Sequence, residues 1–174
     1  MTVGAADSGS GAVNSDYQLE PGDVLSVSVW KEEGLQQEVL VRPDGKVSFP
    51  LAGEIQGQGR SVEQVRMQIT EGIAEYIPDP VVTVSLIQNA GNRLYVIGRV
   101  NKPGEFAINR YIDIMQALAM AGGVTPFAVT KDIKILRRVD GVQQSIQFNY
   151  NEVEKGINLD QNIVLRAGDV VVVP

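Results

Sequence analysis

Acidic side chains are the residues of this chain whose type and spacing are compatible with catalysis. They are the adjacent pair Glu32 and Glu33, the alternate pair Glu152 and Glu154, and Asp132. Two carboxylates that flank a scissile bond are the machinery of glycoside hydrolysis. These residues all lie in polar loops, however, where acidic side chains are far more often solvated than catalytic. We therefore interpret them as surface charges and predict no catalytic residue.

Phosphate binding and nucleophilic catalysis have less support in the sequence. Gly53, Gly57 and Gly59 precede a predicted helix that starts at Ser61, and a helix N-terminus can bind an anion. The chain has no GxxxxGK motif followed by Ser or Thr and no properly placed GxGxxG. Ser61 has no histidine to activate it as a nucleophile, and it fits better as a helix N-cap. We predict no cofactor.

Composition excludes several classes of site and partner. The 174 residues include neither Cys nor His, which rules out disulfides, zinc sites with those ligands and histidine-based acid–base catalysis. We accordingly predict no metal site. With 15 basic and 21 acidic residues, the net charge of −6 argues against nucleic acid as a partner. No run approaches the roughly 18–20 apolar residues of a membrane span.

The first predicted segments are a flexible leader over residues 1–15 and a domain over residues 16–89. The leader is small and polar and lacks the charged and apolar regions of a signal peptide. Residues 24–30 alternate between apolar and polar types, as a half-buried strand does. Pro-Asp-Gly within residues 42–45 predicts the turn of a hairpin between the strands on either side of it.

The second predicted domain spans residues 90–174, after a polar joint at residues 88–92. Residues 93–100 form a predicted strand, and Gly98 within it indicates a bulge or a close backbone approach. Asp140-Gly141 predicts the turn of another hairpin. We expect an α+β fold of two small domains.

One principal helix is expected in each domain, and both begin with a capping box. Ser61 is followed three residues later by Gln64, and Asp113 by Gln116. Apolar residues at helical spacing give each helix one buried face. The predicted helices span residues 61–76 and 113–121, with the apolar faces Val62, Val65, Ile69, Ile73, Tyr76 and Ile114, Ala117, Leu118, Ala121.

Both halves of the chain resemble known domains. The motifs of the second half resemble the SLBB (soluble-ligand-binding β-grasp) domain, and those of the first half resemble the polysaccharide export sequence domain. The second-half motifs are Val96-Ile97-Gly98-Arg99-Val100, Pro103-Gly104-Glu105-Phe106 and Ala117-Leu118 through Ala121-Gly122-Gly123. The first-half motifs are Pro21-Gly22-Asp23, Val41-Arg42-Pro43-Asp44-Gly45-Lys46-Val47 and Phe49-Pro50-Leu51-Ala52-Gly53. In this order the two domains are similar to the outer-membrane polysaccharide export (OPX) family in its short form.

The resemblance implies a non-enzymatic periplasmic component of a capsule or exopolysaccharide exporter. Its implied partners are the exopolysaccharide, further copies of itself in a ring, an inner-membrane polysaccharide co-polymerase and a separate outer-membrane β-barrel. A lipid anchor outside these 174 residues is one way to attach it to the outer membrane. Long family members also carry further β-grasp repeats and a C-terminal amphipathic helix, and this chain ends at Val173-Pro174 with neither. The resemblance therefore does not extend to a channel that the chain makes by itself.

The surfaces expected to join copies are the strand edges next to two Gly-Asp turns and the exposed side of the Ser61 helix. The turns lie in Glu20-Pro21-Gly22-Asp23-Val24 and Arg166-Ala167-Gly168-Asp169-Val170, and the helix side carries Glu63, Arg66, Glu71 and Glu75. The alternative is a monomeric β-grasp module that binds a ligand or a protein. The sequence singles out no residue that contacts polysaccharide.

Overall fold

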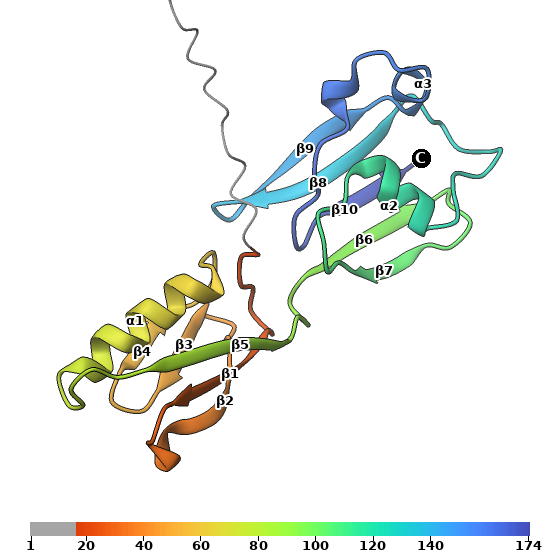
Figure 1. Ribbon diagram of the computed structural model, residues 1–174. Helices are drawn as coiled ribbons and strands as arrows, with labels where there is room; N and C mark the ends of the chain where they lie inside the picture. The colour runs from red at the N-terminus through yellow and green to blue at the C-terminus, as the bar shows by residue number, and fades with distance from the viewer. Residues whose placement is uncertain (1–16) are drawn as a thin grey trace, which may run out of the picture.

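A computed structural model describes residues 17–174 of the chain, so the leader predicted for residues 1–15 lies outside the described residues. Buried apolar side chains form two separate clusters, one built from residues 19–82 and the other from residues 94–173. Each cluster lies between strands and a helix, which confirms the expected fold of two small α+β domains (Figure 1). No helix in this part of the chain combines the length and hydropathy needed to cross a membrane.

The first domain is built on a three-stranded antiparallel sheet in which β1 lies between β2 and β5 (Figure 1). A second sheet contains only β3 and β4. Leu25, Val27 and Val29 on β1 are buried, which confirms the alternation read from the sequence. The strands are β1 (Val24–Val29), β2 (Gln36–Leu40), β3 (Lys46–Phe49), β4 (Gly53–Gln56) and β5 (Val82–Gln88), with the 3-10 turn η1 (Glu33–Leu35) between β1 and β2.

The predicted hairpin around Arg42 to Gly45 is wrong in its strand pairing. The tight turn itself forms, because the Gly45 N–H donates to the Arg42 carbonyl at 2.8 Å and Gly45 adopts a φ of 81°. The strands on either side of it separate, however: β2 pairs with β1, whereas β3 pairs with β4. Pro-Asp-Gly chemistry therefore fixed the local reversal but not the partner of either strand.

Helix α1 (Val62–Ala74) lies against β4 and β5, and its buried face explains its position. Val65, Ile69 and Ile73 are completely buried, and the capping box of Ser61 with Gln64 is present. The predicted extension to Tyr76 is wrong, because the helix ends at Ala74 and the Tyr76 side chain is 63% exposed.

The second domain contains a five-stranded mixed sheet in the order β7-β6-β10-β8-β9. β10 pairs in parallel with β6 and antiparallel with β8, so the last strand of the chain occupies the centre of the sheet. The predicted hairpin at Asp140-Gly141 joins β8 to β9 and is confirmed. The strands are β6 (Arg93–Gly98), β7 (Gly104–Ala107), β8 (Ile133–Val139), β9 (Val142–Phe148) and β10 (Val170–Val173).

Helix α2 (Ile114–Met120) covers one face of this sheet. Its capping box of Asp113 with Gln116 is present, and the side chains of Ile114, Ala117, Leu118 and Ala121 are buried as predicted. A short helix α3 (Tyr150–Glu154) and a 3-10 turn η2 (Leu159–Gln161) lead from β9 towards β10.

Gly98 confirms the expected close backbone approach. A Cβ atom at this position would lie 2.0 Å from the Val173 carbonyl oxygen, and the residue has a φ of 96°. Only glycine combines that φ with that proximity at low cost.

Replacing Leu118 with Asp tests the assignment of the α2 face. Leu118 is 2% exposed, so Leu118→Asp would bury an unpaired carboxylate and is expected to destabilise the protein by about 4 kcal/mol or prevent folding. Ala119→Asp places the same charge on the exposed side of the same helix and is expected to cost less than about 1 kcal/mol. Urea unfolding compares the two, and equal stabilities would contradict the assignment.

Candidate functional site

The carboxylates considered for catalysis are dispersed over both domains. Glu32 and Glu33 lie at the start of η1 and are exposed, as are Asp132 and Glu154 in the second domain. Glu152 is half-buried and accepts hydrogen bonds from the side-chain amides of Asn158, at 3.1 Å, and Gln161, at 2.6 Å. It therefore ties α3 to η2.

The electrostatics of Glu152 are the reverse of those of a general acid. Its two amide hydrogen bonds, from Asn158 and then Gln161, lower the pKa of its carboxyl below the ordinary value. A catalytic acid needs a pKa raised towards the working pH. The arrangement supports a structural role for Glu152.

The glycines before α1 serve turns and packing. Gly53 has a φ of 73° and lies where the chain reverses between β3 and β4. A Cβ atom on Gly57 would lie 3.2 Å from Cγ1 of Val47, so the missing side chain lets this loop pack on the core. The Ser61 hydroxyl accepts the Gln64 N–H at 3.2 Å, as an N-cap does.

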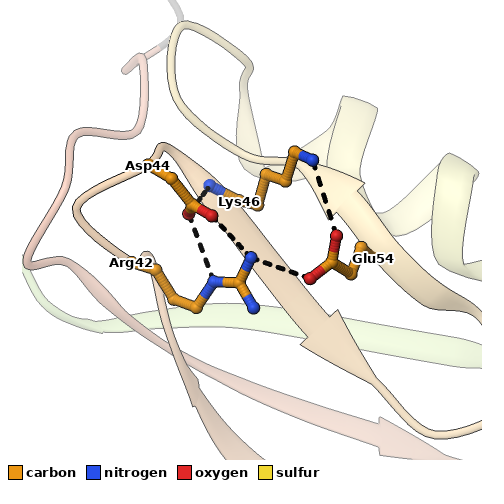
Figure 2. Close-up of polar contacts among 4 residues, drawn as sticks. All are labelled: Arg42, Asp44, Lys46 and Glu54. Atoms are coloured by element: carbon orange, nitrogen blue, oxygen red, sulfur yellow. Dashed lines mark hydrogen bonds and ion pairs between the residues drawn. The ribbon is translucent and has the colours of Figure 1, made fainter.

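A network of four charged side chains joins the turn before β3 to β4 (Figure 2). Arg42 Nη2 lies 2.6 Å from Oδ2 of Asp44 and 2.8 Å from Oε1 of Glu54, and Lys46 Nζ lies 3.5 Å from Oε2 of Glu54. The hydrogen bonds from Arg42 lower the pKa of both carboxyls. All four side chains are at least 37% exposed, so solvent screening limits the energy of the network.

A shallow acidic groove of about 450 Å³ lies on the surface where α1 meets β4. Glu54, Glu71 and Glu75 line it, together with Gln68, whose Oε1 is buried without a hydrogen-bond partner. Two of the residues expected to join copies, Glu71 and Glu75, therefore border a groove.

The other two residues on that side of α1 pair with each other. Arg66 Nε donates to Oε2 of Glu63 at 2.9 Å. This surface remains a prediction as an interface between copies.

Each Gly-Asp turn places a buried aspartate under the start of a strand. Asp23 is 0% exposed, and its carboxylate accepts the Glu20 N–H at 2.9 Å and the Tyr17 hydroxyl at 2.8 Å through Oδ2. Its Oδ1 accepts the Gly91 N–H at 2.9 Å. Burial of the Tyr17 hydroxyl is the larger cause that raises the pKa of this side chain, and its hydrogen bond to Asp23 is the next.

The second turn repeats the first with a different donor. Asp169 is 1% exposed and accepts the Arg166 N–H at 2.8 Å, as Asp23 accepts the N–H three residues before it. Arg137 supplies the remaining hydrogen bonds, with Nε 3.0 Å from Oδ1 and Nη2 2.6 Å from Oδ2. The Arg137 side chain is only 12% exposed, so this is a buried bidentate ion pair.

These turns correct one expectation about self-association. The strands that they launch, β1 and β10, each have a hydrogen-bonded neighbour on both sides. They therefore offer no free edge to another copy, and the free edges of the described sheets belong to other strands.

A hollow of about 340 Å³ lies at the end of β1, and sequence reasoning missed it. We call it the Trp30 hollow. Its lining includes Trp30, Lys31, Glu32, Glu33, Gln36 and Thr83. The signal that the sequence offered was the only tryptophan of the chain, placed where an alternating strand runs into a polar loop.

Comparison with known proteins agrees with the two-domain structure. Residues 11–87 match the family model described as polysaccharide biosynthesis/export protein, and residues 92–173 match the SLBB domain. The chain is 30% identical to the EPS I polysaccharide export outer membrane protein EpsA of Ralstonia nicotianae over 89% of its own length and 46% of that protein.

Two further relatives are named for polysaccharide transport. The polysialic acid transport protein KpsD of Escherichia coli is 32% identical over 70% of this chain and 22% of that protein. The capsule polysaccharide export protein BexD of Haemophilus influenzae is 27% identical over 93% of this chain and 43% of that protein. The chain thus spans about half the length of EpsA and BexD and less of KpsD.

Truncation of Asp23 measures how much the buried carboxylates contribute. Asp23→Ala leaves three donors without their acceptor, and we expect it to lower the free energy of unfolding by about 3 kcal/mol. Asp44→Ala removes an exposed carboxylate that also has charged and backbone partners and is expected to cost much less than Asp23→Ala, because solvent screens its interactions. Chemical denaturation measures the free energy of unfolding of both variants. Equal losses would show that burial of the Asp23 carboxylate adds nothing to its contribution to stability.

Proposed function

The chain belongs to the family of polysaccharide export proteins that join a polysaccharide biosynthesis/export domain to an SLBB domain, and we propose that it is a non-enzymatic component of a machine that exports capsule polysaccharide or exopolysaccharide. The observation that carries the proposal is the order of these two domains along one chain, each with its own core. We place the protein in the periplasm, attached to the outer membrane through a lipid anchor. The proposed domain limits are residues 16–89 and 90–174.

The proposed role is to contribute to a ring of identical copies that surrounds the polymer. A closed ring needs two different surfaces on each copy whose contact repeats by rotation. The mixed charges on α1 and in the acidic groove supply one polar surface, which suits a reversible contact. The edge strands β2, β5, β7 and β9 supply backbone groups for another.

The proposed partners lie on either side of this ring. They are an inner-membrane polysaccharide co-polymerase, which would deliver the polymer, and a separate outer-membrane β-barrel, which would release it. Absence of catalysis is part of the proposal. It is supported by the relatives, which are named for export or transport, and by the scattered positions of the acidic residues.

Deletion of the gene in the bacterium that encodes it tests the function. Extracellular polysaccharide should fall to a small fraction of the parental level, while polymer accumulates inside the cell envelope, because synthesis continues without an exit. Sugar analysis of the two fractions measures this, and a plasmid copy should restore export. Unchanged extracellular polymer would refute the proposal.

Self-association is expected to strengthen with salt. Each copy carries a net charge of −6, and its repulsion is screened as the Debye length falls from about 30 Å at 0.01 M to about 8 Å at 0.15 M salt. Sedimentation velocity over a range of protein and salt concentrations should therefore show larger species at higher salt.

A pair of charge-matched variants locates the contact. Glu71→Gln changes the acidic groove, whereas Glu154→Gln removes one exposed charge from the second domain. Each variant removes one negative charge and so reduces the magnitude of the net charge equally, so weaker association of Glu71→Gln alone would assign the contact to α1. A monomeric mass under all conditions would favour a monomeric β-grasp binding module.

A further inference from the structure

We propose that the Trp30 hollow is a subsite for a pyranose ring of the exported polysaccharide, and that it selects uncharged or amino-sugar residues over acidic ones. This inference rests on the proposed export function, since it assigns the place where polymer contacts the first domain. No residue of the hollow takes part in the two buried-aspartate turns or in the charged network of Figure 2.

The indole ring of Trp30 is exposed to solvent. The Trp30 side chain is 71% exposed, although a tryptophan in a soluble domain is on average highly buried. Val81 beside it is 60% exposed, so the apolar surface continues beyond the ring.

The backbone beneath the ring is fixed. The Trp30 N–H donates to the Val81 carbonyl at 2.9 Å, and the Glu32 N–H donates to the Val29 carbonyl at 3.1 Å. Val29 is 5% exposed and belongs to the core of the domain. Lys31 completes the turn with a φ of 62°, which few residues other than glycine adopt. The tryptophan is therefore presented by an ordered turn.

The surroundings of the ring match the two faces of a sugar. The C–H face of a pyranose is apolar and stacks on an aromatic ring, while its hydroxyls need hydrogen-bond partners around the rim. Glu32, Glu33, Gln36 and Thr83 provide carboxylate, amide and hydroxyl groups in the lining of the hollow. The hollow has a volume of about 340 Å³ and opens widely to solvent, so it suits contact with one face of a sugar ring and not enclosure of a whole ligand.

The same lining argues against a protein partner as the occupant. Tryptophan hot spots of protein interfaces lie in fully desolvated pockets surrounded by contacts that exclude water. Lys31, Glu32 and Glu33 are all exposed and charged, and burying them under a protein would require a partner for each. A sugar hydroxyl donates a hydrogen bond to a carboxylate oxygen of Glu32 or Glu33 while the rest of the charged group stays in water.

Charge sets the class of sugar. The hollow contains two carboxylates, Glu32 and Glu33, against one ammonium group on Lys31. The whole chain adds a net charge of −6. A uronic-acid polymer would therefore meet repulsion, whereas neutral hexoses would not and protonated amino sugars would be attracted.

The emission of Trp30 reports on this site directly, because it is the only tryptophan of the chain. The full chain is titrated with three hexasaccharides of similar length: a neutral glucan, a glucosamine oligomer and a galacturonic-acid oligomer. We expect a saturable shift of the tryptophan emission with the first two, and at least tenfold weaker binding of the galacturonic-acid oligomer. The absence of a saturable response to both the glucan and the glucosamine oligomer would overturn the proposal, as would preference for the acidic oligomer.

Variants separate stacking from general surface effects, with calorimetry as the readout because Trp30→Ala lacks the fluorophore. Trp30→Ala should weaken binding about tenfold, and Trp30→Tyr should retain most of the affinity. Phe127→Ala removes an aromatic side chain of similar exposure, 78%, from the second domain and should leave binding unchanged. Equal effects of Trp30→Ala and Phe127→Ala would overturn the assignment, as would an emission shift that follows protein concentration alone, which would assign the hollow to a protein interface.

Failure of this inference is distinguishable from failure of the proposed function. If the deletion strain loses extracellular polymer but the Trp30→Ala gene restores it fully and no oligosaccharide shifts the emission, the export function stands and the subsite is refuted. If deletion leaves export unchanged, the function is refuted, whatever the oligosaccharides do.

Discussion

A buried aspartate carboxylate that follows a glycine anchors the central strand of each domain. Asp23 stands immediately before β1 and Asp169 immediately before β10, and both strands have neighbours on either side. A buried carboxylate is costly unless donors surround it, and each aspartate receives a backbone N–H from three residues earlier. Since that hydrogen bond closes the turn, the direction in which each central strand enters its sheet depends on the carboxylate. The neighbours that hydrogen-bond directly to that strand are β2 and β5 in the first domain and β6 and β8 in the second.

The same interaction links the domains along the chain. Besides closing its own turn, Asp23 accepts the N–H of Gly91, which lies between β5 and β6. A Cβ atom on Gly91 would lie 2.4 Å from the Pro21 carbonyl oxygen, so only glycine fits this close approach. One carboxylate thus fixes both the first strand of the first domain and the backbone that leads into the second. Asp169 does not link the domains in this way, because Arg137 from the same sheet donates to both of its carboxylate oxygens.

Local features such as helix caps and turns could be predicted from the sequence, whereas the long-range pairing of strands and the partners of the buried aspartates could not. Capping boxes, glycine turns and apolar stripes depend on neighbours within about four residues, and those at Ser61, Asp113 and Asp140-Gly141 appear as predicted. The turn at Arg42 formed as well, but β3 pairs with β4 across the next tight reversal, where Phe49 lies opposite Gly53, and the sequence analysis did not predict that hairpin. The repeated Gly-Asp turn was visible, whereas the burial of its aspartate depends on partners that are distant in sequence: Gly91 lies 68 residues from Asp23, and Arg137 lies 32 residues from Asp169. The Trp30 hollow was not predicted, because the sequence analysis assigned Trp30 to the strand over residues 24–30.

The physical demands of polymer transport favour a surface of this kind over an enclosed pocket. A chain that must move past a protein needs contacts strong enough to guide it and weak enough to release it, as ions do in a pore. One exposed aromatic ring with a rim of solvated polar groups provides a shallow contact, because little surface is withdrawn from water and no buried polar group must be re-paired on release. If identical copies surround the polymer in a closed assembly, each copy presents the same Trp30 side chain and the same polar groups to it. Guidance then comes from many equivalent weak contacts, and the backbone hydrogen bond from Trp30 to the Val81 carbonyl keeps the tryptophan in the same position in every copy.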